Sequence, residues 1–407
     1  MNSPVVIHRA AWVLPISEPI IRDGAVAVLG GKILALGPFD QLKQRFSGVE
    51  VLHHGACVLM PPLINAHVHL ELSHIAFLGR EQPPASFTSW VERLIKERGR
   101  HPFSEEEILE KGREVLRNLY NQGVSGLGDT GNLLASASIG ADFPGRSLFF
   151  HEHLGFSPQA AERELQAAQG EGVEGNCTPH APYSCNSLLI KGLKERAQRN
   201  NTLISIHVAE TEAENRFIRH GDGPFRDFLE KLGAMDPTFR AEAIDNCGAM
   251  RYLNQHGILD QGTICVHCVH VNDMEIQYIA DSGAKVCLCP GSNRFLGVGR
   301  APVARFLSAG ILPALGTDSL ASNPELSLWR EMRLLREDNP EVDARDILAM
   351  ATYGGARALG MDDVYGCLSE GLSAEMLAVP VGDQCATGGE VLEFLISAHP
   401  DIIPIRV

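Results

Sequence analysis

Five residues that could bind or work beside a metal ion stand at the ends of short apolar runs typical of buried strands: His67, His69, His207, His267 and Asp318. Residues two apart on an extended backbone point to the same face, so His67 and His69 can reach one ion. Three neutral imidazoles and one carboxylate from this set suit Zn²⁺ or Fe²⁺, with one position left for water. Each residue alone is commonly structural, and their joint placement is what indicates a site.

Other histidine and cysteine motifs have simpler interpretations. A second His-x-His pair, His151 and His153, is expected to make substrate contacts or to lie in a loop, with a second metal site as the alternative. Cys265 and Cys268 have the spacing of a zinc half-site, but no second pair is suitably spaced, so no structural zinc is expected there. The sequence therefore predicts one metal centre.

An alternation of short apolar runs and amphipathic segments follows from about residue 57 and must position these side chains. Helix patterns include Ser104–Gln122, where Ser104 and Glu107 form a capping-box pair. Eight candidate strands cover 57–67, 124–129, 146–150, 174–179, 202–207, 262–267, 284–289 and 311–318. Eight βα units predict an α/β fold of the (β/α)₈ TIM-barrel type over residues 57–360, with the chemistry at the carboxyl ends of the strands.

The two ends of the chain have a different texture. Residues 1–56 contain short β-branched runs separated by Gly and Pro, and residues 361–407 contain three further strand-like runs, at 375–381, 391–397 and 402–407. We expect the two segments to pair in a small composite β-sandwich domain.

Composition excludes several classes of function. The chain has 407 residues and a formal charge of −15, so a nucleic-acid-binding face, which needs clustered Lys and Arg, is not expected. No apolar run reaches the roughly 18 residues that a membrane span requires. The ten cysteines are scattered, and the first residues lack a signal-peptide pattern, which predicts a reduced, cytoplasmic protein with a small-molecule substrate.

Six motifs in chain order resemble the amidohydrolase superfamily, in its cytosine-deaminase-like and chlorohydrolase-like branch. They are PPLINAHVHLELS (61–73), TPHAPYSC (178–185), ISIHVAET (204–211), ICVHCVHV (264–271), CPGSNRFLGVG (289–299) and ALGTDS (314–319). The resemblance covers nearly the whole chain and implies a metal-dependent TIM barrel. It departs from the family pattern at Pro61-Pro62 and in the degraded run 371–380. No lysine ends the fourth strand, which disfavours a binuclear centre.

The resemblance also implies roles for individual residues. One divalent ion, Zn²⁺ with Fe²⁺ as the alternative, would be held by four ligands: His67, His69, His207 and Asp318. Asp318 would also accept a proton from the attacking water, His267 would orient that water, and Glu210 would shuttle protons to a ring nitrogen and the leaving group.

Short motifs within this branch look most like the aminodeoxyfutalosine deaminases of menaquinone biosynthesis. His180, Glu71 and Trp90 are then expected to contact the substrate. The alternatives are deamination of 5′-methylthioadenosine, S-adenosylhomocysteine, adenosine or guanine, a chlorohydrolase-type reaction, and an inactive metal-binding scaffold. Barrels of this kind frequently dimerise, so a homodimer is a further expectation.

Overall fold

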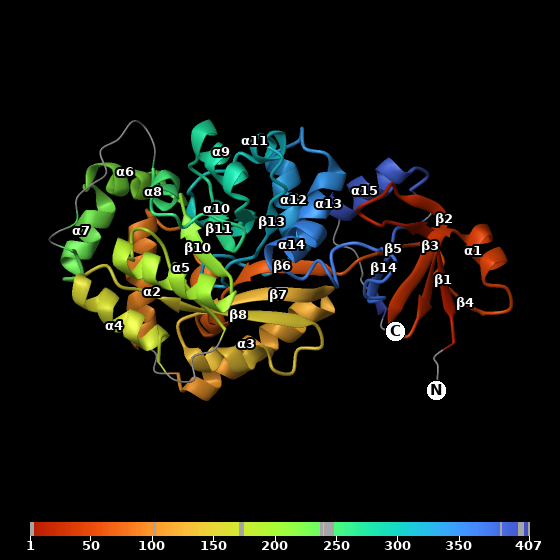
Figure 1. Ribbon diagram of the computed structural model, residues 1–407, viewed down its shortest axis with the longest axis horizontal. Coiled ribbons are helices and arrows are strands. Elements are labelled where there is room, and N and C mark those ends of the chain that lie inside the picture. Colours follow the sequence, from red (N-terminus) through yellow and green to blue (C-terminus); the bar gives the residue numbers. More distant parts are fainter. Residues whose placement is uncertain are drawn as a thin grey trace.

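Two regions make up the molecule, an eight-stranded barrel with its helices and, at one end, a β-sheet built from strands near both ends of the chain (Figure 1). The computed structural model describes residues 4–100, 103–170, 175–236, 239, 248–382, 385–397 and 403–405. Within these ranges, no helix has the length and apolar character needed to cross a membrane.

The barrel consists of two four-stranded parallel sheets that meet at two seams. In chain order the strands are β6 (Leu63–Val68), β7 (Val124–Gly131), β8 (Arg146–His153), β9 (Asn176–Pro179), β10 (Ile204–Val208), β11 (Thr263–His267), β12 (Lys285–Leu288) and β13 (Ala314–Leu315). At one seam, the backbone N–H of His207 donates to the carbonyl of His180 at 2.9 Å. At the other, Val68 and Asp318 form a parallel bridge, and the N–H of Thr317 donates to the carbonyl of His67 at 3.0 Å. The expected (β/α)₈ architecture is confirmed.

Helices follow most of the barrel strands and cover the outside of the barrel (Figure 1). The predicted capping box of α3 is present, because the Ser104 side chain accepts from the N–H of Glu107 and the Glu107 carboxylate accepts from the N–H of Ser104. The helices are α2 (Phe87–Arg100), α3 (Glu105–Asn121), α4 (Pro158–Ala168), α5 (Ser187–Asn200), α6 (Glu212–His220), α7 (Pro224–Lys231), α8 (Ala249–Gln255), α9 (Asp273–Ser282), α10 (Pro290–Leu296), α11 (Val303–Ser308), α12 (Leu328–Asp338), α13 (Ala344–Ala349) and α14 (Gly355–Ala358), with short 3₁₀ or π turns η1 (Leu70–Ile75), η2 (Leu78–Arg80), η3 (Leu134–Gly140) and η4 (Met350–Gly354).

Strands from both chain ends form one hydrogen-bonded sheet in the order β15-β14-β5-β1-β2-β3. Its members are β1 (Val6–Val13), β2 (Ile21–Leu29), β3 (Lys32–Pro38), β4 (Glu50–His53), β5 (Cys57–Met60), β14 (Met376–Pro380) and β15 (Ile403–Ile405), with α1 (Phe39–Arg45) beside it. The sheet forks at β1, whose first half pairs with β4 and whose last residues pair with β5. The strands of the two chain ends thus pair as expected, but in the described residues they form a single forked sheet rather than the two layers of a sandwich.

Two strand predictions need correction. The single strand expected over 57–67 is two strands, because Pro61-Pro62 ends β5, and β5 belongs to the terminal sheet rather than to the barrel. The strand expected over 391–397 is wrong, since these residues form most of α15 (Gly388–Ser397). Val391 and Leu395 are four residues apart and both buried, which is helical spacing that the apolar content of the run conceals. The run at 402–407 lies partly outside the described residues.

Asn65 ties the first and last barrel strands together. Its side-chain N–H donates to the Thr317 hydroxyl at 2.8 Å, and its Oδ1 accepts from the Thr317 N–H at 3.2 Å, all within the protein interior. We expect Asn65→Ala to lower the free energy of unfolding by about 2–4 kcal/mol, because it leaves buried partners unpaired. Urea denaturation measures this change. Asn118→Ala, at an exposed position of α3, is the control and should change stability by less than about 0.5 kcal/mol; equal losses in the two variants would contradict the role of Asn65.

Candidate active site

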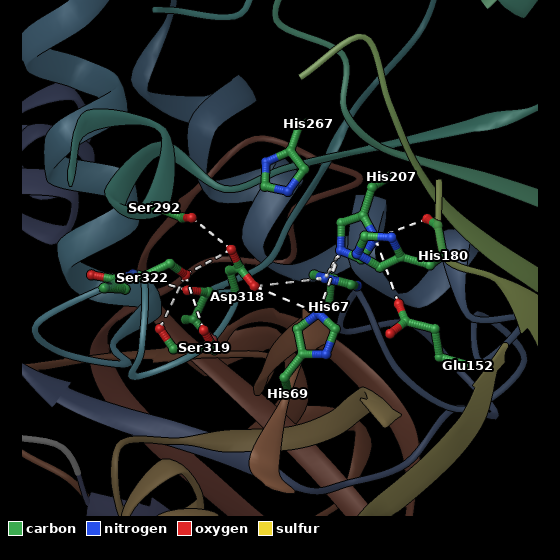
Figure 2. Close-up of polar contacts among 12 residues, drawn as sticks. His67, His69, Glu152, His180, His207, His267, Ser292, Asp318, Ser319 and Ser322 are labelled. Carbon is green, nitrogen blue, oxygen red and sulfur yellow. Dashed lines mark hydrogen bonds and ion pairs between the residues drawn. The ribbon is translucent and has the colours of Figure 1, made fainter. Parts of the chain in front are cut away.

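Four side chains carried by β6, β10 and β13, or by the residues that follow these strands, bring their donor atoms together at the mouth of the barrel. His67 lies in β6, His69 directly follows it, His207 lies in β10 and Asp318 follows β13 (Figure 2). The Nε2 atom of His207 is 3.1 Å from that of His67 and 3.4 Å from that of His69. The Asp318 Oδ1 atom is 3.6 Å from His69 Nε2 and 4.0 Å from His67 Nε2. The structure thus brings together the four residues expected to bind metal.

These separations fit a divalent metal ion. A tetrahedral zinc ion with ligands at about 2.0–2.1 Å sets those ligands about 3.3 Å apart, close to the spacing of the three imidazole nitrogens. Three nitrogens facing one point cannot all hydrogen-bond to one another, because a neutral imidazole offers only one N–H and one acceptor. Burial, followed by the neighbouring His69, lowers the pKa of His67 well below its ordinary value, so the ring is the neutral form that binds metal.

Further contacts fix the orientation of the ligands. His207 donates from Nδ1 to the backbone carbonyl of His180 at 3.0 Å, which leaves its Nε2 lone pair facing the cluster. The Asp318 Oδ2 atom accepts from the hydroxyls of Ser292 at 2.6 Å and Ser322 at 2.8 Å, so that Oδ1 remains free to face the histidines (Figure 2). His207 and Asp318 are therefore held in position by the protein itself.

Glu210 and His267 lie beside this cluster. His267 donates from Nδ1 to the Asn293 side chain at 2.9 Å, and its Nε2 lies 3.6 Å from Glu210 Oε1. Burial, followed by the charges of Asp318 and Glu214, raises the pKa of Glu210 well above its ordinary value. A raised pKa favours the protonated form of a buried carboxyl, which can then donate its proton.

Glu214 holds the backbone that carries Glu210. Its carboxylate accepts from the N–H of Ala209 at 3.1 Å and from the N–H of Glu210 at 2.9 Å. Ala209 has a positive φ of 51°, as do His267 at 72° and Asp318 at 56°. Such conformations cost non-glycine residues energy and are concentrated at functional sites, where the surrounding structure maintains them.

A cavity of about 140 Å³ opens above the cluster. Its wall includes His180, Tyr183, Glu210 and His267, and one face of α2 closes it. That face presents Trp90, Val91, Leu94, Ile95 and Arg98, which follow helical spacing. Trp90, which is expected to contact the substrate, lies on the cavity wall, and its indole N–H donates to the carbonyl of Ala321 at 3.1 Å.

Glu71 does not line this cavity. It is 2% exposed and accepts from the backbone N–H of Leu133 at 3.0 Å and from Arg98 at 3.1 Å. Arg98, which does line the cavity, also donates to Asn132 at 3.1 Å. The structure thus corrects the expectation of a direct substrate contact by Glu71. This side chain instead accepts a hydrogen bond from Arg98 on the side remote from the cavity.

His180 and Glu152 complete the wall next to His207. The His180 ring stands 4.9 Å from that of His207, and its Nδ1 hydrogen-bonds to Ser184 at 2.6 Å. Burial, followed by the charge of His69, lowers the pKa of His180 to about 3, which keeps the ring neutral. Glu152 Oε1 lies 3.7 Å from His207 Nδ1. His151 and His153, on either side of Glu152 in β8, lie in a strand rather than a loop and do not line the cavity.

Several site residues were missed from the sequence. The face of α2 carried a usable signal in its apolar residues at 87, 90, 91, 94 and 95, which indicate an amphipathic helix that covers something apolar. Arg98 follows on the same face. No comparable signal marks Glu152, Glu214 or Asn293, whose roles depend on contacts between distant segments.

Comparison with known proteins identifies the family of this chain and finds proteins that are similar to it in sequence and in fold. The model of the amidohydrolase family matches residues 58–388. Aminodeoxyfutalosine deaminase from Deinococcus radiodurans is 30% identical over 352 residues, covering 83% of this chain and 81% of that protein. A 5-methylthioadenosine/S-adenosylhomocysteine deaminase from Pelotomaculum thermopropionicum is 28% identical over 393 residues, covering 92% and 84%.

Among solved structures, aminofutalosine deaminase from Helicobacter pylori in complex with methylthio-coformycin superposes with a TM-score of 0.81 over 97% of each chain, at 23% identity. This likeness concerns the fold. The chain belongs to the amidohydrolase family. It is a hydrolytic deaminase, and its four converging donors fit a divalent metal ion.

His207 connects the metal ligands to the cavity wall, so its removal should empty the site. We expect His207→Ala to lower the bound metal by about one equivalent per chain, because three donors remain and one of the imidazoles that set the geometry is lost. Elemental analysis of the purified, desalted protein measures this. His220→Ala, at an exposed position of α6, should leave the metal content unchanged; unchanged content in His207→Ala would place the ion elsewhere.

Proposed function

We propose that this protein hydrolyses the exocyclic amino group of a 6-aminopurine nucleoside derivative, with aminodeoxyfutalosine, an intermediate of menaquinone biosynthesis, as the preferred substrate. The observation that carries the proposal is the position of Glu210, a buried carboxyl with a raised pKa, 3.6 Å from His267 and beside the four converging donors. Deamination requires a group that gives a proton to a ring nitrogen while water attacks the adjacent carbon. The raised pKa of Glu210 and its position in the cavity wall suit it to that role.

The residues His67, His69, His207 and Asp318 would hold one Zn²⁺ ion, with Fe²⁺ as the alternative, since both accept three imidazoles and a carboxylate. When bound, such an ion lowers the pKa of water to about 7 and supplies a nucleophile at neutral pH. The chain does the rest: Asp318 accepts a proton from the attacking water, and His267, held by Asn293, orients that water.

Proton transfer by Glu210 balances the reaction. The water oxygen forms a bond to C6 of the purine while Glu210 gives its proton to N1. Asp318 then passes the proton taken from water to the amino group, the C6–N bond breaks and ammonia leaves. The hydroxyl at C6 becomes a carbonyl as it gives its remaining proton to Glu210. Because burial favours the neutral form of Glu210, each cycle ends with this carboxyl protonated again.

The cavity suits a substrate that is only partly enclosed. Its volume of about 140 Å³ is below the roughly 300–1,000 Å³ of pockets that enclose a whole drug-sized ligand. The purine would occupy the deep part beside His180 and Trp90, and the rest would extend past Leu154 and Ile95, two apolar side chains exposed at the mouth. Arg98 stands on this outer wall, and aminodeoxyfutalosine carries a carboxylate at the end remote from its purine.

A deaminase of 5′-methylthioadenosine or S-adenosylhomocysteine is the second candidate, because the Pelotomaculum relative with that name covers more of the chain. Adenosine, guanine and chlorinated-ring substrates are the remaining alternatives. Ammonia and chloride release from metal-loaded protein, measured over all of these compounds, separates them. The highest kcat/KM for aminodeoxyfutalosine is expected. Turnover of none of them would overturn the deaminase proposal and favour an inactive scaffold.

The only substrate we propose is a small molecule, and the net charge of −15 gives no support to a nucleic-acid partner. The nine cysteines of the described residues are all free, which suits a reducing compartment such as the cytoplasm. A homodimer and the absence of a membrane partner complete the proposal.

Glu210→Gln separates metal binding from proton transfer. The variant keeps the size of the side chain and leaves the four donors in place, so we expect full metal content and a fall in kcat of about 10²–10⁴-fold. Steady-state ammonia release and elemental analysis measure the two effects. Glu212→Gln, an exposed neighbour two residues along, is the matched control and should retain wild-type kcat. Full activity in Glu210→Gln would refute the proton-transfer role.

Arg98→Met tests the substrate assignment. The loss of a charge-assisted hydrogen bond is expected to raise KM for aminodeoxyfutalosine roughly 10-fold or more, with KM for uncharged 5′-methylthioadenosine unchanged. Arg98→Lys, which keeps the charge but not the two-pronged geometry, should fall between wild type and Arg98→Met. An equal rise in KM for both substrates would mean that Arg98 only supports the wall through Glu71 and Asn132.

A further inference from the structure

A second cluster of metal-ligand side chains lies on the opposite side of β8 from the active site. Successive residues of a strand point to opposite faces, so Glu152, which approaches His207, separates His151 and His153 from the barrel mouth. In the neighbouring strand β9, Cys177 pairs directly with His151. One donor atom of each of these three residues lies within 4.8 Å of the other two.

Hydrogen bonds already fix one nitrogen of each imidazole. His151 donates from Nε2 to the backbone carbonyl of Asn132 at 3.2 Å, and His153 donates from Nδ1 to Glu164 Oε2 at 3.0 Å. Because a neutral imidazole has one N–H, the other nitrogen of each ring carries a lone pair. These atoms, His151 Nδ1 and His153 Nε2, are both buried without a hydrogen-bond partner.

Two lone pairs buried in this way are unusual. Native proteins pair nearly all buried polar side-chain atoms, and an unpaired one costs roughly 1–3 kcal/mol. His153 is only 2% exposed, so bulk water does not compensate for it. A ligand that accepts lone pairs from nitrogen and sulfur together would satisfy all three side chains.

We propose that His151, His153 and Cys177 bind a second zinc ion, separate from the one at the barrel mouth. Two imidazoles and a thiolate are preferred ligands of zinc, and zinc sites place such donors about 3.3–3.8 Å apart. The cluster therefore closes on an ion with small side-chain rotations. The bond from His153 Nδ1 to Glu164 is the carboxylate–histidine arrangement that orients histidine ligands of metals.

Zinc binding at this cluster releases a proton. The Cys177 thiol gives up its proton to solvent as the sulfur–zinc bond forms, with no change in oxidation state. The Glu164 side chain is 28% exposed and marks the side from which an ion can enter.

A zinc ion at this site would stabilise the part of the barrel that lies next to the wall of the substrate cavity. It joins β8, β9 and, through Glu164, helix α4. The backbone carbonyl of His153 accepts from the N–H of His180 at 3.1 Å, so the same strand end also supports a cavity residue. None of the three ligands of the second ion lines the proposed substrate cavity, so the role that we propose for this ion is structural.

Cobalt substitution distinguishes the two ions. The protein is stripped with a chelator and reloaded with Co²⁺, whose bond to a thiolate gives an intense near-ultraviolet charge-transfer band. Among the described residues no cysteine lines the cavity at the barrel mouth, so such a band does not come from the first site. Wild type is expected to bind two equivalents and to show the band at full intensity with one of them.

Cys177→Ser is expected to lose the band and about one equivalent of metal, whereas Cys385→Ser, which removes a partly exposed thiol outside the barrel strands, retains both. His153→Asn provides a second variant with an intact thiol and should bind about one equivalent, with the band lost or greatly weakened. Absence of the band in cobalt-loaded wild type, or its survival in Cys177→Ser, would overturn the proposal. The band does not depend on turnover, so a chain inactive on every nucleoside tested would still show it.

Discussion

The active site depends on the contact between the first and the last barrel strand. Asp318 can reach His67 and His69 only because β13 returns beside β6, where the N–H groups of Thr317 and Asp318 both donate to the carbonyl of His67. The same contact positions a carboxylate that has one oxygen facing the imidazoles and the other held by two serine hydroxyls. Closure of the barrel and assembly of the donor set are thus one structural event, although 251 residues separate His67 from Asp318 in the sequence.

The strained backbone and the clustered imidazoles of the site cost free energy, and hydrogen bonds from surrounding residues offset that cost. Ala209, His267 and Asp318 adopt positive φ angles, and the Nε2 atoms of three imidazoles lie close together in a buried cluster. Glu214, Asn293 and Ser292 offset this cost with hydrogen bonds to the backbone or side chains of the site. These contacts within the chain position the side chains of the site, which is what electrostatic preorganisation requires.

Sequence reasoning recovered the barrel and the residues that converge in it, because strand ends in a parallel barrel meet at one face whatever the register. It failed where the outcome depends on contacts between segments. Glu71 follows the metal motif closely enough to suggest a substrate contact, but η1 turns it inward to Arg98. The run at 391–397 is apolar enough for a strand. It forms a helix instead, and one face of that helix, which carries Val391 and Leu395, is buried in the hydrophobic core.

The two His-x-His motifs show why spacing alone does not define a site. His67 and His69 face the barrel mouth, whereas His151 and His153 face away from it, because in β8 the residue between the histidines, Glu152, points inward instead. Spacing of two specifies only that the imidazoles share a face. Which face they share is set by the register of each strand against its neighbours, here by the pairing of His151 with Cys177. The two donor sets also differ in kind: one combines three imidazoles with a carboxylate, and the other combines two imidazoles with a thiol, which is a softer donor.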